Sequence, residues 1–161
     1  MGWHRSATYW TTFDLGYSCP RVDLLAGQPG HAEGSHYLVH ENEQLMQRLI
    51  AFAKRTYFLC RVLPRDHLAR HIADQLFRSA SSSGANYAEA RVAASARDRI
   101  HKMRISLKEL NETTYWLQLI GETELIHSDR ISDLLDECQQ LSRIFNSSIH
   151  NRRKREVTAD L

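Results

Sequence analysis

Apolar residues recur every three or four positions along most of the chain, which is the spacing of one face of an α-helix. The first stretch with this pattern begins at Glu43 and ends at Pro64, because the residue before a proline is displaced from the helical region. It predicts an amphipathic helix with a broad apolar face. That face has two adjacent rows, which are Leu45, Leu49, Phe52, Thr56, Leu59 and Leu63, and beside them Met46, Ile50, Ala53, Tyr57 and Cys60.

A second helix is predicted from about Arg65 to Ala94, and the residues of its inward row become small halfway along. Serine, glycine and asparagine are poor helix formers, so their presence at inward positions needs a reason. Small side chains let a neighbouring helix approach closely, and we expect such close packing. A kink at Ser83–Gly84 is the alternative. The inward row is Leu68, Ile72, Leu76, Ser79, Ser83, Asn86, Ala90 and Ala93.

Two further helices follow with short connections. The third is predicted from about Ser95 to Ile120, with Gly121 as its C-terminal cap, and the fourth begins after Ser128 as N-cap. Four amphipathic helices in this arrangement predict an all-α, antiparallel up-down four-helix bundle. The inward rows are Ile100, Met103, Leu107, Leu110, Thr114 and Leu117 in the third helix, and Ile131, Leu134, Cys138, Leu141 and Phe145 in the fourth.

Residues 1–42 lack this periodicity and are rich in glycine, proline and histidine. We expect an irregular N-terminal arm over 1–42, or extra residues translated from an upstream start codon, and one bundle domain with a basic C-terminal tail over 43–161. His31, His36 and His40 are a candidate metal cluster, but a glycine-rich segment does not hold ligands in a fixed geometry. We therefore expect no metal site.

Composition narrows the class of protein. The chain has 161 residues, 42% of them hydrophobic and 25% charged, with a net charge of +2, as in an ordinary globular domain. No apolar run is long enough for a membrane helix, and three cysteines without CxxC spacing suggest reduced thiols and a cytoplasmic location. The absence of GxSxG, P-loop and HExxH motifs favours a protein that is not an enzyme and needs no cofactor.

Two polar groups of residues stand out on the second and third helices. Arg78, Ser82, Asn86 and Glu89 form a row beside the inward row of the second helix. We expect Arg78 and Asn86 to bridge to Glu109 and Glu112 of the same or an adjacent subunit. Losing one partner of such a buried charged pair would cost about 3–5 kcal/mol.

On the third helix, Ile105, Glu109, Glu112 and Trp116 share an arc opposite the inward row, with Lys108 at its edge. A tryptophan on such a face indicates a contact surface. We expect burial against another subunit. The alternatives are a ring lying over Glu112 and cover by the N-terminal arm.

The fourth helix ends in four consecutive basic residues, Arg152, Arg153, Lys154 and Arg155. Cations near a helix C-terminus complement the helix dipole, but four in a row exceed that need. They are candidate contacts to a phosphate backbone. A solvated tail is the alternative.

Two segments, "RSASSSGANYAEA" (78–90) and "KMRISLKELNETTYWLQLI" (102–120), together resemble the bundle family of proteins encoded in intervening sequences of bacterial 23S rRNA genes. The resemblance covers residues 43–149 and implies a ring-like homopentamer. It also implies similarity in fold to accessory proteins of diversity-generating retroelements, which bind nucleic acid and a reverse transcriptase. The expected function is therefore a non-enzymatic oligomeric bundle that binds RNA, DNA or a nucleoprotein partner. An assembly or adaptor protein with protein partners only is the alternative. The matching residues are Arg78, Ser79, Ser82, Asn86, Glu89, Ala90, Lys108, Glu109, Glu112, Tyr115, Trp116 and Leu117.

Overall fold

The computed structural model describes the backbone of residues 33–159 and the side chains of residues 43–152. The described backbone forms four helices and no strand, which confirms the all-α prediction. The first helix begins at Glu33 rather than Glu43, so the last part of the predicted arm is helical, and residues 1–32 lie outside the described residues. The helices are α1 (Glu33–Val62), α2 (His67–Arg91), α3 (Ala96–Glu122) and α4 (Asp129–Ala159).

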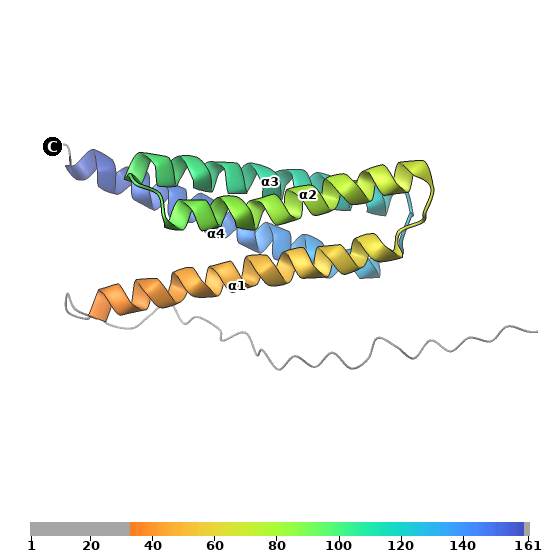
Figure 1. Ribbon diagram of the computed structural model, residues 1–161, viewed down its shortest axis with the longest axis horizontal. Helices are drawn as coiled ribbons and strands as arrows, with labels where there is room; N and C mark the ends of the chain where they lie inside the picture. Colours follow the sequence, from red (N-terminus) through yellow and green to blue (C-terminus); the bar gives the residue numbers. More distant parts are fainter. Residues whose placement is uncertain (1–32, 160–161) are drawn as a thin grey trace, which may run out of the picture.

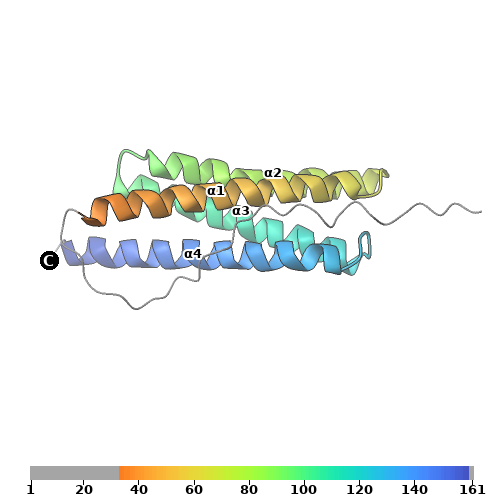
Figure 2. The same ribbon diagram turned by 90° about the horizontal axis from the view of Figure 1, so that it is seen from below.

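The four helices run alternately up and down the long axis of the bundle (Figure 1). The start of α1, the connection from α2 to α3 and the finish of α4 lie at one end, and the two other connections lie at the opposite end. Figure 2 shows the same arrangement after a quarter turn. Segments that are far apart in the sequence therefore meet at each end.

Local hydrogen bonds explain where the helices begin. The Asp66 carboxylate accepts from the amides of Leu68 and Ala69 at 3.0 Å, which starts α2 one turn after Pro64. The Ser95 hydroxyl accepts from the Asp98 amide at 3.1 Å at the start of α3. Both caps satisfy backbone N–H groups that have no partner inside the helix.

The predicted cap at Gly121 is wrong, because α3 continues to Glu122. The left-handed residue that ends the helix is Glu124, with φ of 51°. Its amide donates to Gly121 O at 3.1 Å, and the Leu125 amide donates to Ile120 O at 3.3 Å. These two bonds are those of a Schellman motif, placed three residues later than the glycine suggests.

The core draws on all four helices. Every residue of the predicted inward row of α4 is buried, which confirms that row. The predicted inward position of Leu68 in α2 is wrong. Leu68 lies in the first turn and is 73% exposed, while Ala69 beside it is buried. In α1 the first row is largely buried, whereas Ile50 and Tyr57 of the second row are exposed.

The small residues of α2 pack closely, as predicted. Ser79, Ala80 and Ser83 have no exposed surface. A Cβ added at Gly84 would lie 3.6 Å from Leu49 Cβ, so α1 passes directly over this stretch. The helix is continuous from His67 to Arg91, and close packing is therefore the reason for the small residues.

Candidate functional site

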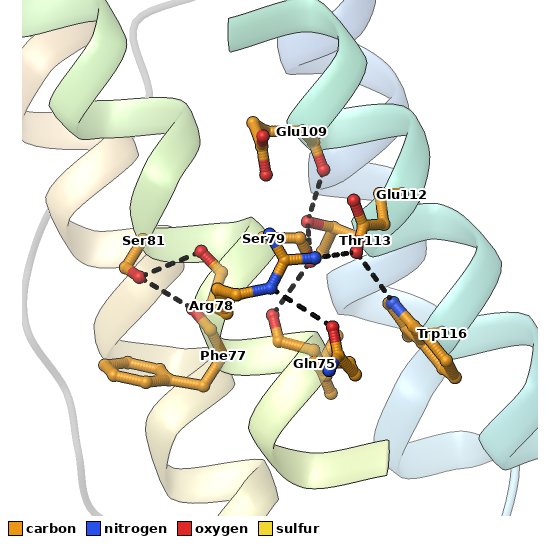
Figure 3. Close-up of polar contacts among 10 residues, drawn as sticks. Gln75, Phe77, Arg78, Ser79, Ser81, Glu109, Glu112, Thr113 and Trp116 are labelled. Carbon is orange, nitrogen blue, oxygen red and sulfur yellow. Dashed lines mark hydrogen bonds and ion pairs between the residues drawn. The ribbon is translucent and has the colours of Figure 1, made fainter. Parts of the chain in front are cut away.

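The predicted bridge between α2 and α3 is present within one chain. Arg78 Nη2 pairs with Glu112 Oε1, and Arg78 Nε donates to Gln75 Oε1 at 3.1 Å (Figure 3). The same Glu112 oxygen accepts from Trp116 Nε1 at 3.3 Å. The side chains of Arg78 and Glu112 are 52% and 34% exposed, so the expectation of a buried pair is wrong.

Trp116 is half-buried against the core of its own chain. Its ring meets the rings of His71 from α2 and Tyr115 edge to face, with centroids 6.0 and 5.0 Å apart. The prediction that this arc lies opposite the core is wrong, because α3 packs against both α2 and α4 and so buries more than one narrow row. Trp116 thus lies beside Glu112, as one of the alternatives stated, and its contact with another subunit remains a proposal.

Asn86 and Glu89 have partners other than those that the sequence predicts. Asn86 Nδ2 donates to Ser82 O at 2.9 Å within α2, so the expected bridge from Asn86 to α3 is wrong. Glu89 instead pairs with Lys102 of α3, and this contact raises the pKa of Lys102. Lys108 is exposed.

Glu109 lies beside the Arg78–Glu112 pair and is half-buried. Its Oε2 has no hydrogen-bond partner among the described residues (Figure 3). Burial, followed by the neighbouring charge of Glu112, raises the pKa of Glu109, and Arg78 opposes that shift. The arrangement thus places two carboxylates, those of Glu109 and Glu112, near the single guanidinium of Arg78.

Beneath this polar row, two buried hydroxyls join the helices. Thr113 Oγ1 lies 2.9 Å from Ser79 Oγ in a hydrogen bond. Ser106 and Thr113 are buried, although sequence reasoning did not place them in the core. Helical spacing could have placed both in the core, because they continue a row at three–four spacing. That row is Met103, Ser106, Leu110, Thr113 and Leu117.

The end of the bundle where α4 finishes carries arginines from three helices. We call Arg91, Arg97, Arg99, Arg104 and Arg152 the basic end. Arg91 and Arg99 were not predicted as site residues, because only the fold brings α2, α3 and α4 together there. Of the predicted run, Arg152 is half-buried, and the side chains of Arg153, Lys154 and Arg155 lie outside the described residues.

A cavity of about 250 Å³ opens at the basic end, and we call it the end cavity. Arg91 pairs with Glu43 of α1 at 2.9 Å. Hydrogen bonds from Gln47 and Arg91, and the charge of Arg91, lower the pKa of Glu43. Arg99 Nε is buried with no hydrogen-bond partner among the described residues. The lining comprises Tyr87, Arg91, Arg99, Ser148 and Arg152, with Leu45, Ala90 and Met103 as the apolar wall.

His31, His36 and His40 lie outside the residues whose side chains the structure describes, so the expectation of no metal site there stays a prediction. The part of the chain that the structure describes holds no group of three histidine, cysteine, aspartate or glutamate residues able to bind a metal ion. Burial raises the pKa of the thiols of Cys60 and Cys138 to about 11, so both stay protonated at neutral pH. Among the described residues, no helix is long and apolar enough to cross a membrane.

Comparison with known proteins finds similarity over nearly the same range of residues as the resemblance of the two sequence segments. The family model described as "23S rRNA-intervening sequence protein" matches residues 41–147. A crystal structure of a protein of unknown function from the S23 ribosomal protein family of Bacteroides thetaiotaomicron is 32% identical, with a TM-score of 0.64. The alignment covers 68% of this chain and 97% of that one. No curated protein matches the chain.

Proposed function

Because this chain belongs to the family of 23S rRNA-intervening sequence proteins, we propose that it is a non-enzymatic, oligomeric bundle that binds nucleic acid. The ligand is RNA or DNA, free or within a nucleoprotein, and the basic end is the contact surface. The observation that supports this proposal is the convergence of Arg91, Arg99 and Arg152 from three helices around one cavity.

Arginine suits this role because its planar guanidinium donates two parallel hydrogen bonds to a phosphate and stays charged at all physiological pH values. Arg153, Lys154 and Arg155 follow Arg152 in the sequence, within α4. A second hollow at the start of α3, of about 410 Å³, is lined by Arg97, His101 and Arg104 together with Ser95 and Asp98. Together these residues provide several phosphate contacts along one end of the bundle.

The test is the salt dependence of binding. The affinity for a single-stranded RNA and a DNA duplex is measured over a range of salt concentrations for the wild type and for a variant with Arg152, Arg153, Lys154 and Arg155 replaced by glutamine. Each lost phosphate contact reduces the slope of log affinity against log salt by about 0.7–0.9. We expect the variant to lose affinity and at least one such increment.

The matched control replaces Lys54, Arg55, Arg65 and Arg130 by glutamine. These four residues are exposed, contain the same three arginines and one lysine, and lie outside the basic end. Equal losses in the two variants would contradict the proposal, because the effect would then follow net charge alone. Undetectable binding of the wild type at low salt would also contradict it.

A second function is favoured by an exposed cluster of rings on α1 and α2. We call Tyr57, Phe58 and Phe77 the aromatic patch, and they are 43%, 47% and 39% exposed. The Tyr57 ring lies 5.4 Å from that of Phe58 and 5.9 Å from that of Phe77. Aromatic clusters of this kind are typical of protein interfaces.

The aromatic patch supports assembly into a homo-oligomer, for which we propose the pentamer that the family resemblance implies. It equally suits an adaptor that binds only proteins, a reverse transcriptase among them. Both functions belong in the cytoplasm, where the thiols of Cys60 and Cys138 stay reduced. Absence of nucleic-acid binding together with a stable complex through this patch would favour the adaptor.

A further inference from the structure

The outward face of α3 carries a row of basic, amide and aromatic side chains that share one side of the helix. Its members are separated alternately by four and three residues, so they form a nearly straight line on the surface. Every one of them is exposed, whereas Met103, Ser106 and Leu110 on the inward side of the same turns are buried. We call this row the α3 stripe, and it comprises Arg97, His101, Arg104, Lys108, Asn111 and Tyr115.

The first part of the α3 stripe is basic. Arg97 and Arg104 lie two turns apart and Lys108 follows one turn later, so the three cations span about 16 Å along the helix axis. His101 lies between the two arginines and adds a ring that can donate a hydrogen bond to a phosphate. Asp98 shares the hollow at the start of α3 with Arg97, His101 and Arg104, where two guanidinium groups face its one carboxylate. A line of exposed cations is complementary in charge to the successive phosphates of a nucleic-acid strand.

The stripe continues past the cations to an exposed ring. Tyr115 is 56% exposed, and its ring meets that of Trp116 edge to face with centroids 5.0 Å apart. Trp116 is half-buried against the core, so the tyrosine ring packs on a fixed neighbour while more than half of its surface meets solvent. An aromatic ring held at the surface beyond a row of cations offers a face on which a nucleobase can stack.

The combination of cations and an exposed ring distinguishes a single strand from a duplex. In a duplex the bases stack on one another, and a surface helix reaches only phosphates, sugars and the edges of bases. In a single strand the bases can turn outward, so phosphates contact cations while a base stacks on a ring. Asn111 lies between Lys108 and Tyr115 and adds an amide that can bond to the edge of such a base. The α3 stripe therefore matches a single strand better than a duplex.

We propose that the α3 stripe binds a single-stranded nucleic acid that lies along α3, with its phosphates on the cations and one base stacked on Tyr115. This inference rests on the proposed nucleic-acid function, and it extends the contact surface from the basic end along the side of the bundle. The distance along the axis from Arg97 to Tyr115 is about 27 Å, which accommodates several nucleotides. RNA and DNA strands share this chemistry, so both are used as probes.

The first experiment tests the phosphate contacts. The affinity for a short fluorescent single strand is measured by anisotropy over a range of salt concentrations. Arg104→Gln with Lys108→Gln should weaken binding and reduce the slope of log affinity against log salt by about 1.4, because each lost contact to a single strand removes about 0.7. The matched control, Lys54→Gln with Arg55→Gln, removes the same two charges from exposed positions on α1 and should keep the slope.

The second experiment tests the stacking contact. Tyr115→Ala should weaken binding of the single strand at least about fivefold, which is the loss expected when one base–aromatic stack is removed. It should leave the salt slope unchanged, because no phosphate contact is lost. Tyr115→Phe keeps the ring and should bind like the wild type. The affinity for a duplex of the same sequence should be equal in Tyr115→Ala and the wild type, because its bases stay stacked on one another.

Circular dichroism confirms that each variant is folded. If Tyr115→Ala does not fold, Tyr115→Leu takes its place, because leucine keeps apolar packing against Trp116 but offers no aromatic face. The same losses of single-strand and of duplex affinity in the Tyr115 variant would overturn the stacking contact. The same loss of salt slope in the α1 control would overturn the phosphate contacts.

Failure of this inference differs from failure of the proposed function. Single-strand binding that depends on the run from Arg152 to Arg155 but is unchanged in both α3 variants would overturn the α3 stripe and leave the basic end as the contact surface. A wild type that binds neither strand nor duplex at low salt would overturn the proposed function, and this inference with it.

Discussion

At the scale of single residues, Arg78 illustrates how exposure sets the value of an ion pair. Its guanidinium joins α2 to α3 through Glu112, but water reaches both groups. Exposed pairs contribute about 0.2–1 kcal/mol, because solvent screens the charges and two long side chains lose freedom. The pair therefore contributes little to the stability of the bundle.

A double-mutant cycle tests this view of the pair. Arg78→Ala, Glu112→Ala and the double variant are compared by chemical denaturation, and we expect a coupling free energy of about 0.2–1 kcal/mol. Coupling of about 3 kcal/mol or more is the value for a buried pair and would show that the bridge is desolvated in solution. Lys108→Ala, an exposed residue on the same helix, is the control.

Glu109 gives a pH dependence with a definite sign. Its pKa is raised in the folded state from the ordinary value of 4.5, so the folded state binds more protons than the unfolded state just above that value. Stability therefore falls as the pH rises through that window, and the charged Glu109 is destabilising at neutral pH.

Glu109→Gln should remove that penalty. We expect a higher melting temperature than the wild type at neutral pH and little difference below pH 4.5, where the wild-type carboxyl is also protonated. Glu122→Gln, at an exposed residue near the end of α3, should show no such pH-dependent gain. A lower melting temperature of Glu109→Gln at neutral pH would mean that the carboxylate has a partner that stabilises it.

At the scale of helices, the small residues of α2 determine how closely α1 and α3 approach. Ser83 and Gly84 lie on the packed side, and Leu49 of α1 is in van der Waals reach of Gly84. Overpacking a full interior costs about 1–3 kcal/mol. We expect Ser83→Leu and Gly84→Leu each to lower the free energy of unfolding by about that amount.

Ala85→Leu is the matched control for this stretch, because Ala85 is exposed on the same turn of α2. It should leave stability close to that of the wild type, because an exposed side chain displaces no neighbour and leucine is nearly as good a helix former as alanine. Equal denaturation midpoints for all three variants would show that the stretch has room for larger side chains.

The helices also show which features the sequence can predict. Three–four spacing located all four helices and the whole inward row of α4, because that row is apolar and contacts its neighbours along its length. It failed at Leu68, where a first-turn residue has nothing to pack against, and at Trp116, where two neighbouring helices widen the buried face of α3. The spacing of apolar residues indicates which face of a helix is buried, but not how many neighbouring helices pack against it.

The candidate site was predictable only where its residues are adjacent in the sequence or form a motif. The run from Arg152 to Arg155 and the Arg78–Glu112 bridge belong to those classes. Arg91 and Arg99 belong to neither class, because neither is part of a run or a motif. They come together only because the up-down topology brings both to the end cavity. A Schellman motif closed by Glu124 was equally hidden, since glycine is the usual residue there.

At the scale of the whole molecule, charge and exposed apolar surface lie on different regions. The basic end collects arginines where α4 finishes, while the aromatic patch lies on α1 and α2 nearer the opposite end. A subunit that assembles through the patch would keep its basic end accessible. Several such ends in one oligomer would bind one nucleic acid with increased avidity.

The solution mass tests whether the aromatic patch is the assembly surface. Buried aromatic side chains are frequent interface hot spots, and truncating one costs about 2 kcal/mol or more of association free energy. We expect Tyr57→Ser with Phe77→Ser to shift the mass measured by light scattering towards that of a single chain, with unchanged helix content. Leu68→Ser with Val92→Ser is the control, because both residues are exposed and isolated at the ends of α2.

The variant Trp116→Ala tests whether subunits join through the aromatic patch or through the polar row between α2 and α3. Its ring packs on His71 and the core of its own chain, so we expect a lower melting temperature and an unchanged oligomer mass. Loss of mass with unchanged stability would instead place the subunit contact on the face that holds Trp116, Arg78 and Glu112. If the wild type has the mass of one chain, neither surface joins subunits, and the proposed homo-oligomer is wrong.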